Sequence, residues 1–160
     1  MPVTSRGGMM AWLAARHSDR FGALVAESAY SDLPAEIVRR PELGEVLAEL
    51  IPGYAKNRDA ALRQRSVVNW ADELAAGMPV LMLHGTADER VSPGSALRLA
   101  ARLQALNRPY RLVMFKGGGH DLPGTHGEEV TREVIRWFER NLGPAADRRP
   151  GHERRCPAAR

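Results

Sequence analysis

The order of apolar and polar positions along the chain predicts three strands. Residues 79–84 form an unbroken apolar run, as found in strands that are covered on both faces of a sheet. Residues 22–28 form a shorter apolar run, and residues 110–115 form a third. The chain therefore contains the strands of a buried sheet.

Helices are predicted between these strands and after them. Residues 7–17 carry apolar side chains at helical spacing. Ser92, followed by a proline, supplies the N-cap and first turn of a second helix. A last helix is predicted to begin at a capping box of Thr125 and Glu128 and to end at Gly143. The apolar stripes are Leu99, Leu103 and Leu106 in the second helix, and Val130, Val134, Trp137 and Phe138 in the last.

Residues 32–75 form a different kind of segment. They are charged, broken by three prolines and patterned as several short helices, such as residues 42–51. We interpret them as a helical excursion above the sheet. The remaining order of helices and strands implies right-handed crossovers, and therefore a mostly parallel sheet with helices on both faces. The predicted class is α/β, with one domain over residues 1–143.

Composition narrows the class of protein. Apolar residues make up 44% and charged residues 26% of the 160 residues, as in ordinary globular proteins. Most of the net charge of +4 comes from residues 144–160, which hold five arginines against two acidic residues. Since three prolines accompany them, we predict a basic disordered tail and no nucleic-acid partner. Its single cysteine, Cys156, is interpreted as an incidental exposed thiol.

Several function classes are not indicated by the sequence. No apolar run reaches the roughly 18 residues of a membrane span, and the first residues lack the pattern of a secretory signal. We expect a cytoplasmic protein with no membrane partner. Metal-ligand spacing, a phosphate loop and a dinucleotide fingerprint are also lacking, so neither a metal nor another cofactor is expected.

Ser5 is the candidate nucleophile. It lies between a short apolar segment and the start of the first helix, with Gly7 close behind it. A tight turn from strand to helix lifts a serine hydroxyl clear of the sheet, and the small neighbour avoids a clash. The helix N-terminus would direct backbone N–H groups, Arg6 first, at a developing oxyanion. A serine at this position alone would more simply be a helix N-cap.

Asp88 and His120 are the candidate partners of Ser5. Asp88 follows the buried strand after the turn at Gly85, where its carboxylate could orient a histidine ring. His120 follows the next strand and three glycines, so that its Nε2 could serve as general base. The chain order Ser, Asp, His is that of α/β-hydrolases. His84, inside the buried strand, is interpreted as a structural histidine.

At these residues the sequence resembles the catalytic domain of the prolyl oligopeptidase family of serine peptidases. The segments that carry the resemblance are residues 5–10 around the serine, residues 83–91 around the aspartate, residues 117–120 and residues 134–138. The resemblance covers residues 5–142 and implies the C-terminal half of an α/β-hydrolase domain. It also implies hydrolysis of a peptide or ester through an acyl-enzyme.

Two features keep alternatives open. Only four residues precede Ser5, so we expect a truncated copy that is weakly active or inactive, with self-association or complementation by a chain that supplies the missing strands. The triad does not separate amide from ester substrates, so a carboxylesterase or lipase-like hydrolase is the first alternative. A non-catalytic interaction module is the second.

Overall fold

The computed structural model of the protein describes residues 3–143. Four strands and six α-helices follow one another in the described part, with two 3₁₀ turns, η1 (Val67–Asn69) and η2 (Ala71–Glu73), before the third strand. The strands are β1 (Val3–Thr4), β2 (Leu24–Glu27), β3 (Val80–Gly85) and β4 (Tyr110–Phe115). The helices are α1 (Arg6–Arg16), α2 (Leu33–Arg39), α3 (Glu42–Leu50), α4 (Arg58–Gln64), α5 (Pro93–Ala105) and α6 (Leu122–Leu142).

The strands form one parallel sheet in the order β1-β2-β3-β4. β3 pairs with β2 from Val80 onward and with β4 as far as Gly85. Every residue of β3 is buried, because the strand has neighbours on both sides and helices over both faces. The predicted parallel sheet is confirmed, and its carboxyl ends form a common edge.

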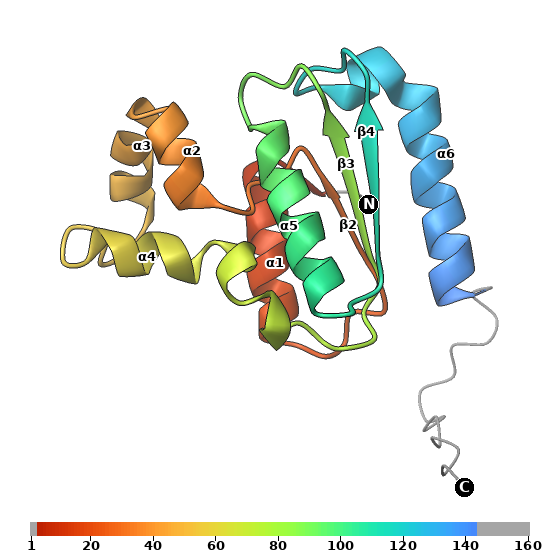
Figure 1. Cartoon of the computed structure of the whole chain (residues 1–160), viewed down its shortest axis with the longest axis horizontal. Helices are drawn as coiled ribbons and strands as arrows, with labels where there is room; N and C mark the ends of the chain where they lie inside the picture. The colour runs from red at the N-terminus through yellow and green to blue at the C-terminus, as the bar shows by residue number, and fades with distance from the viewer. Residues whose placement is uncertain (1–2, 144–160) are drawn as a thin grey trace, which may run out of the picture.

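Helices cover both faces of this sheet (Figure 1). α1 and α5 lie on one face, where Trp12, Leu99 and Leu103 pack against β2 and β3. α6 lies on the other face and buries Val130 and Trp137. The two apolar layers separate the strands from water on both sides, as the apolar runs predicted.

The helices α2, α3 and α4 project from one side of the sheet layer (Figure 1). They enclose a separate apolar cluster that contains Leu33, Leu47 and Leu62. Tyr30, just after β2, and Val91, just after β3, belong to the same cluster. The excursion is therefore packed onto the carboxyl edge of the sheet through the loops that follow the strands.

The start of α6 differs from the sequence prediction. The helix begins at Leu122, and Asp121 caps it by accepting a hydrogen bond from the Gly124 N–H at 3.4 Å. Thr125 lies inside the first turn, where its hydroxyl donates to the Asp121 carbonyl at 3.3 Å. The predicted capping box at Thr125 is wrong, because an earlier aspartate takes the N-cap. A kink at His126, with φ −133°, marks the point where the regular helix resumes.

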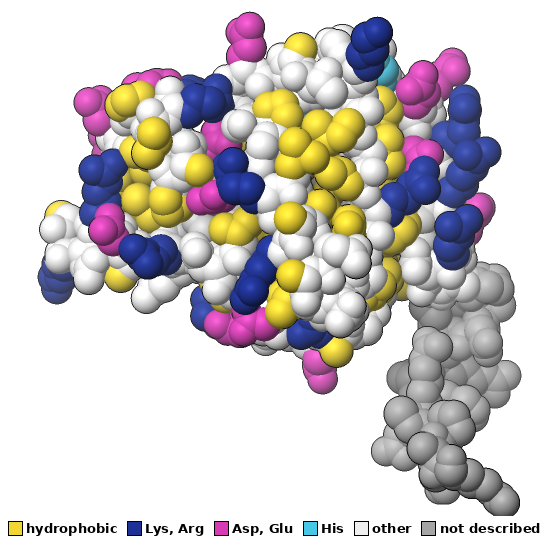
Figure 2. All heavy atoms as spheres, viewed as in Figure 1, with side chains coloured by type: hydrophobic (Ala, Val, Ile, Leu, Met, Phe, Trp, Pro, Cys, Tyr) yellow, Lys and Arg dark blue, Asp and Glu magenta, His cyan; other side chains and the backbone are white. Residues whose placement is uncertain are grey.

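The division of the chain into a domain and a tail stays a prediction, since residues 144–160 lie outside the described part. Among the described residues, no helix is both long enough and apolar enough to cross a membrane. On the face in Figure 2, basic and acidic side chains are interspersed over α2–α4 and along α6. This face carries no large region of a single charge.

Candidate active site

Ser5 occupies the sharp turn between β1 and α1. Its backbone has φ 54° and ψ −120°, a conformation that L-residues rarely adopt. The Ser5 N–H donates to the Glu27 carbonyl at 3.1 Å, which ties the turn to β2. The side chain makes no capping hydrogen bond to the helix. Ser5 therefore holds the N-cap position without using its hydroxyl as a cap, and its backbone is strained.

The Asp88 carboxylate is buried and fully engaged. Its Oδ1 accepts the Arg90 and Val91 N–H groups, each at 2.9 Å, and its Oδ2 lies 2.9 Å from His120 Nδ1. Burial alone would raise the pKa of Asp88. Hydrogen bonds from His84, the Val91 N–H and His120 outweigh burial and hold this pKa well below its usual range. Asp88 is therefore a carboxylate at neutral pH.

His120 meets Asp88 through Nδ1, and its side chain is 16% exposed. A carboxylate can only accept, so the ring proton is assigned to Nδ1 and the lone pair to Nε2. This tautomer is the one that a general base needs. Among the described residues, no hydrogen bond joins the Ser5 hydroxyl to His120. Catalytic hydrogen bonds are often long in a protein without substrate.

The loop that carries His120 turns back over the end of β3. The Gly118 carbonyl accepts the Ala87 N–H at 2.9 Å, and the Gly117 N–H donates to Thr86 Oγ1 at 2.8 Å. A Cβ on Gly85 would lie 2.1 Å from the Gly118 oxygen, so only glycine permits this approach. Close backbone contact thus holds the histidine loop against the aspartate turn.

The three candidate residues all follow strands at the carboxyl edge of the parallel sheet. Asp88 and His120 are in direct contact. Ser5 follows β1, which is separated from β3 by β2. The Ser5 N–H donates to the Glu27 carbonyl at 3.1 Å, which places the Ser5 turn against the end of β2. The catalytic roles of Ser5, Asp88 and His120 stay a prediction.

Arg6 is the first residue of α1, with its side chain exposed. The first N–H groups of a helix have no partner within the helix. The first turn of α1 contains no acidic residue to neutralise the positive end of the helix dipole. The Arg6 N–H is thus suited to an oxyanion, and this role also remains a prediction.

Sequence reasoning missed two polar residues beside the Ser5 turn. Glu27 and Ser28 are buried, and their side-chain oxygens have no hydrogen-bond partner among the described residues. Burial, with a smaller contribution from Asp121, raises the pKa of Glu27. The sequence did hold a signal, namely a charged residue inside an apolar strand. Polar groups of this kind gather at functional sites.

A second missed feature connects α2 to the aspartate loop. Arg39 donates to the Glu89 and Arg90 carbonyls at 2.9 and 3.0 Å, and Arg40 donates to the Arg90 carbonyl at 2.7 Å. The buried Glu36 accepts the Ser92 N–H at 3.1 Å. These partners lie about fifty residues apart, which no local sequence pattern indicates. The excursion thereby fixes the backbone beside Asp88.

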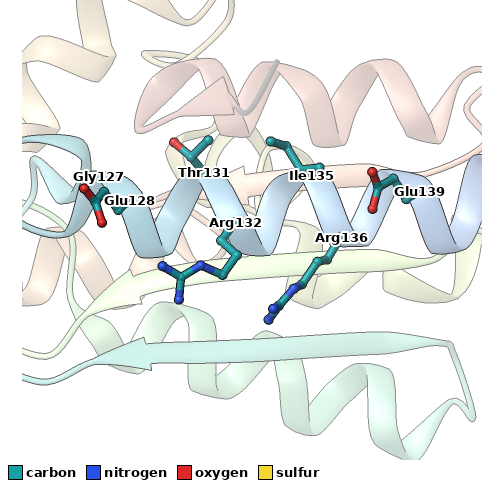
Figure 3. A pocket seen from close by; sticks show the side chains of 7 residues that line it. All are labelled: Gly127, Glu128, Thr131, Arg132, Ile135, Arg136 and Glu139. Atoms are coloured by element: carbon teal, nitrogen blue, oxygen red, sulfur yellow. The ribbon is translucent and has the colours of Figure 1, made fainter.

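A surface hollow in the described part lies away from these residues. It runs along the outer side of α6, and its described lining comes from that helix alone (Figure 3). The lining residues are Gly127, Glu128, Thr131, Arg132, Ile135, Arg136 and Glu139. None of them is a candidate catalytic residue. Within residues 3–143, no group of three or more His, Cys, Asp or Glu side chains is arranged to hold a metal ion.

A parallel sheet with helices on both faces, and a Ser-Asp-His set in that chain order at its carboxyl edge, defines part of an α/β-hydrolase. Solved structures bear out this class. The chain matches a puromycin-hydrolysing peptidase of Mycobacterium tuberculosis with a TM-score of 0.68 and 25% identity, over 89% of this chain and 22% of that one. It also matches an acetyl ester-xyloside bifunctional hydrolase of Caldicellulosiruptor lactoaceticus with a TM-score of 0.63 and 20% identity, over 87% and 55%.

The family follows from the sequence match. The family model for the prolyl oligopeptidase family of peptidases matches residues 4–145, so the chain belongs to this family of hydrolytic enzymes. The uncharacterized peptidase YtmA of Bacillus subtilis is 24% identical over 136 residues, which are 84% of this chain and 52% of that protein. The resemblance predicted from the motifs is confirmed. The chain spans about half the length of this curated relative.

Proposed function

We propose that the chain carries the catalytic residues of a serine-type peptidase. The observation that carries the proposal is the 2.9 Å contact between Asp88 Oδ2 and His120 Nδ1, at the same sheet edge as the strained Ser5 turn. This contact leaves His120 Nε2 free to act as the base. The Ser5 hydroxyl makes no capping hydrogen bond to α1. The names of the related peptidases support peptide substrates.

The chemistry proceeds in two halves. His120 Nε2 takes the Ser5 proton as Ser5 Oγ attacks the carbonyl carbon, and the Arg6 N–H donates to the resulting oxyanion. The tetrahedral intermediate collapses, and His120 returns the proton to the departing amine, which leaves an acyl group on Ser5. Water then attacks the acyl carbon with His120 as base, and this step releases the acid and restores Ser5. The Asp88 carboxylate stabilises the imidazolium in both halves.

We also propose that further polypeptide completes the active site. β1 has two residues and pairs on one side only, with β2, in the described part. An edge strand of this kind accepts another strand readily. A second oxyanion donor, supplied by another segment or a second chain, would contribute about 2.7–4 kcal/mol of transition-state stabilisation. We therefore propose that the chain alone is weakly active.

An ester substrate is the second candidate. The acyl-enzyme chemistry is the same for both, and the match to an acetyl ester-xyloside hydrolase means that the fold itself does not choose between them. The choice depends on the walls around the scissile bond and not on the three catalytic residues.

The test compares an ester and an amide that carry the same acyl group, with wild type and Ser5→Ala side by side. Cleavage of both substrates by wild type, lost in Ser5→Ala, supports the peptidase. Cleavage of the ester alone favours the esterase. Folded wild type that cleaves neither substrate, with a biological effect unchanged in Ser5→Ala, favours the non-catalytic interaction module.

A further inference from the structure

A second histidine lies against the carboxylate of Asp88. His84 is in β3, is 1% exposed, and points its Nε2 at the Val91 carbonyl at a distance of 3.0 Å. A carbonyl can only accept, so the acceptor assigns the ring proton to Nε2. The Val91 bond alone would make His84 a structural residue that closes the loop after β3.

The same Nε2 lies 3.3 Å from Asp88 Oδ2. That oxygen is also the one that His120 Nδ1 contacts at 2.9 Å, so Oδ2 stands between two imidazole rings. Oδ1 accepts the Arg90 and Val91 N–H groups at 2.9 Å each, and it lies 3.2 Å from His120 Nδ1. His84 is therefore the only other side chain in the described part within ion-pair or hydrogen-bonding distance of Asp88.

The position of His84 in the sheet makes this contact rigid. Its backbone pairs with Met114 of β4, and β3 is buried throughout. The ring therefore cannot leave the carboxylate without opening the sheet core. A fixed N–H dipole directed near a buried carboxylate acts much more strongly than one in water, because the surroundings do not reorient to screen it.

We propose that His84 is a positioning residue of the catalytic set, which holds the Asp88 carboxylate in place and takes up part of its charge. The inference rests on the proposed hydrolase function, since it concerns the same aspartate. Without the His84 N–H, Asp88 would direct more of its negative charge at His120. The imidazolium form of His120 would then persist to higher pH, and the base form needed for attack on substrate would be scarcer near neutrality.

Other ionisable groups surround the pair from several elements. They are Tyr30 after β2, Glu36, Arg39 and Arg40 of α2, Arg90 in the aspartate loop, and Asp121 beside His120. None of these side chains is altered by a substitution at residue 84. A shift that follows the residue-84 side chain is therefore assigned to its contact with Asp88.

The experiment uses His84→Leu, which removes the donor, and His84→Gln, which places an amide N–H near the position of Nε2. Met82→Leu, a buried change in the same strand, is the matched control. The pH titration of the His120 ring is followed by NMR, with its signals assigned from a His120→Gln spectrum. The pH dependence of labelling by a fluorophosphonate serine-hydrolase probe is recorded in parallel. Neither readout would move if His84 only supported the fold.

The expected result is a His120 titration midpoint about 0.5–1 pH unit higher in His84→Leu, with an equal displacement of the acid limb of labelling. His84→Gln and Met82→Leu should both follow wild type. Coincident titrations in wild type and His84→Leu would overturn the inference, as would equal shifts in His84→Leu and Met82→Leu. Folded wild type that resists labelling contradicts the proposed hydrolase instead, while the NMR titration still decides the role of His84.

A second measurement applies if His84→Leu does not fold. In Asp88→Asn, the carboxylate charge beside His84 is removed with little change of shape. The His84 Nε2 proton resonance should then move upfield, because the charged acceptor becomes neutral and the hydrogen bond weakens. An unchanged resonance would mean that His84 does not sense Asp88, and the inference would be wrong.

Discussion

The contact between Gly85 and the histidine loop gives a sharp prediction for Gly85→Ala. A Cβ at residue 85 would lie 2.1 Å from the Gly118 oxygen, 2.4 Å from the Gly118 carbonyl carbon and 2.6 Å from the Gly119 oxygen. All three are backbone atoms, so no side-chain rotation relieves the clash. The loop that carries His120 must move, or the end of β3 must bend.

The required movement follows from the distances. Real Cβ atoms almost never approach another atom closer than 3.0 Å, so the Gly118 oxygen must retreat by about 1 Å. His120 is two residues further along, and the Nδ1–Oδ2 distance of 2.9 Å would open toward 4 Å, beyond hydrogen-bonding range. A displacement of about 1 Å at a catalytic group costs roughly 10²-fold in rate. Overpacking would also lower the free energy of unfolding by about 1–3 kcal/mol.

The assay is the second-order rate constant for fluorophosphonate labelling, with thermal unfolding measured on the same samples. Gly119→Ala is the matched control, because it lies in the same glycine run and a Cβ there meets nothing within 4 Å. We expect about a hundredfold loss of labelling in Gly85→Ala and a change of less than about threefold in Gly119→Ala. A folded Gly85→Ala protein that labels like wild type would refute the claim that this contact positions His120.

Three further predictions concern residues around the site. Ser5→Gly and Ser5→Ala should both resist labelling. In urea unfolding, Ser5→Gly should be about 1 kcal/mol more stable than Ser5→Ala, because residue 5 has φ 54° and glycine adopts that conformation freely. Equal stability of the two variants would contradict strain at the turn. Burial raises the pKa of Glu27, so wild type should lose stability as the pH rises from 4.5 through that raised pKa. Over the same pH range, the Tm of Glu27→Gln should rise relative to the Tm of wild type. A difference in Tm that stays constant from pH 4 to 8 would contradict a raised pKa of Glu27. In the double variant Arg39→Met/Arg40→Met, hydrogen exchange at the amides of residues 90 and 91 should be about tenfold faster, because α2 no longer holds their loop. In the surface variant Arg102→Met, the exchange rates of these amides should equal those of wild type.

Local patterns in the sequence predicted most of the fold. The apolar run at residues 79–84 became the fully buried β3, and the stripe of Val130 and Trp137 became the inner face of α6. Ser92 caps α5 with its hydroxyl, as its place before a proline predicted. These features could be predicted because each depends on a few neighbouring residues. The predicted start of α6 was wrong because Asp121 takes the N-cap four residues before Thr125, with Pro123 in the first turn.

The contacts that assemble the site could be predicted only in part. The order of Ser5, Asp88 and His120 at strand ends indicated that they would share one edge of the sheet. It did not indicate that His84 would stand behind Asp88, since an interpretation as a structural histidine fits a buried strand equally well. The link from α2 to the aspartate loop joins residues about fifty positions apart. Such contacts depend on how the excursion packs, which no periodicity in the chain encodes.

The most direct test of the central claim is to locate the adduct of a fluorophosphonate probe on the purified protein by mass spectrometry, in wild type, His120→Ala and Asp88→Asn. The proposed catalytic set predicts one adduct per chain, on Ser5, formed at least about a hundredfold more slowly in His120→Ala. Folded wild type with no adduct, an adduct on another residue, or modification of Ser5 at an equal rate without His120 would contradict it.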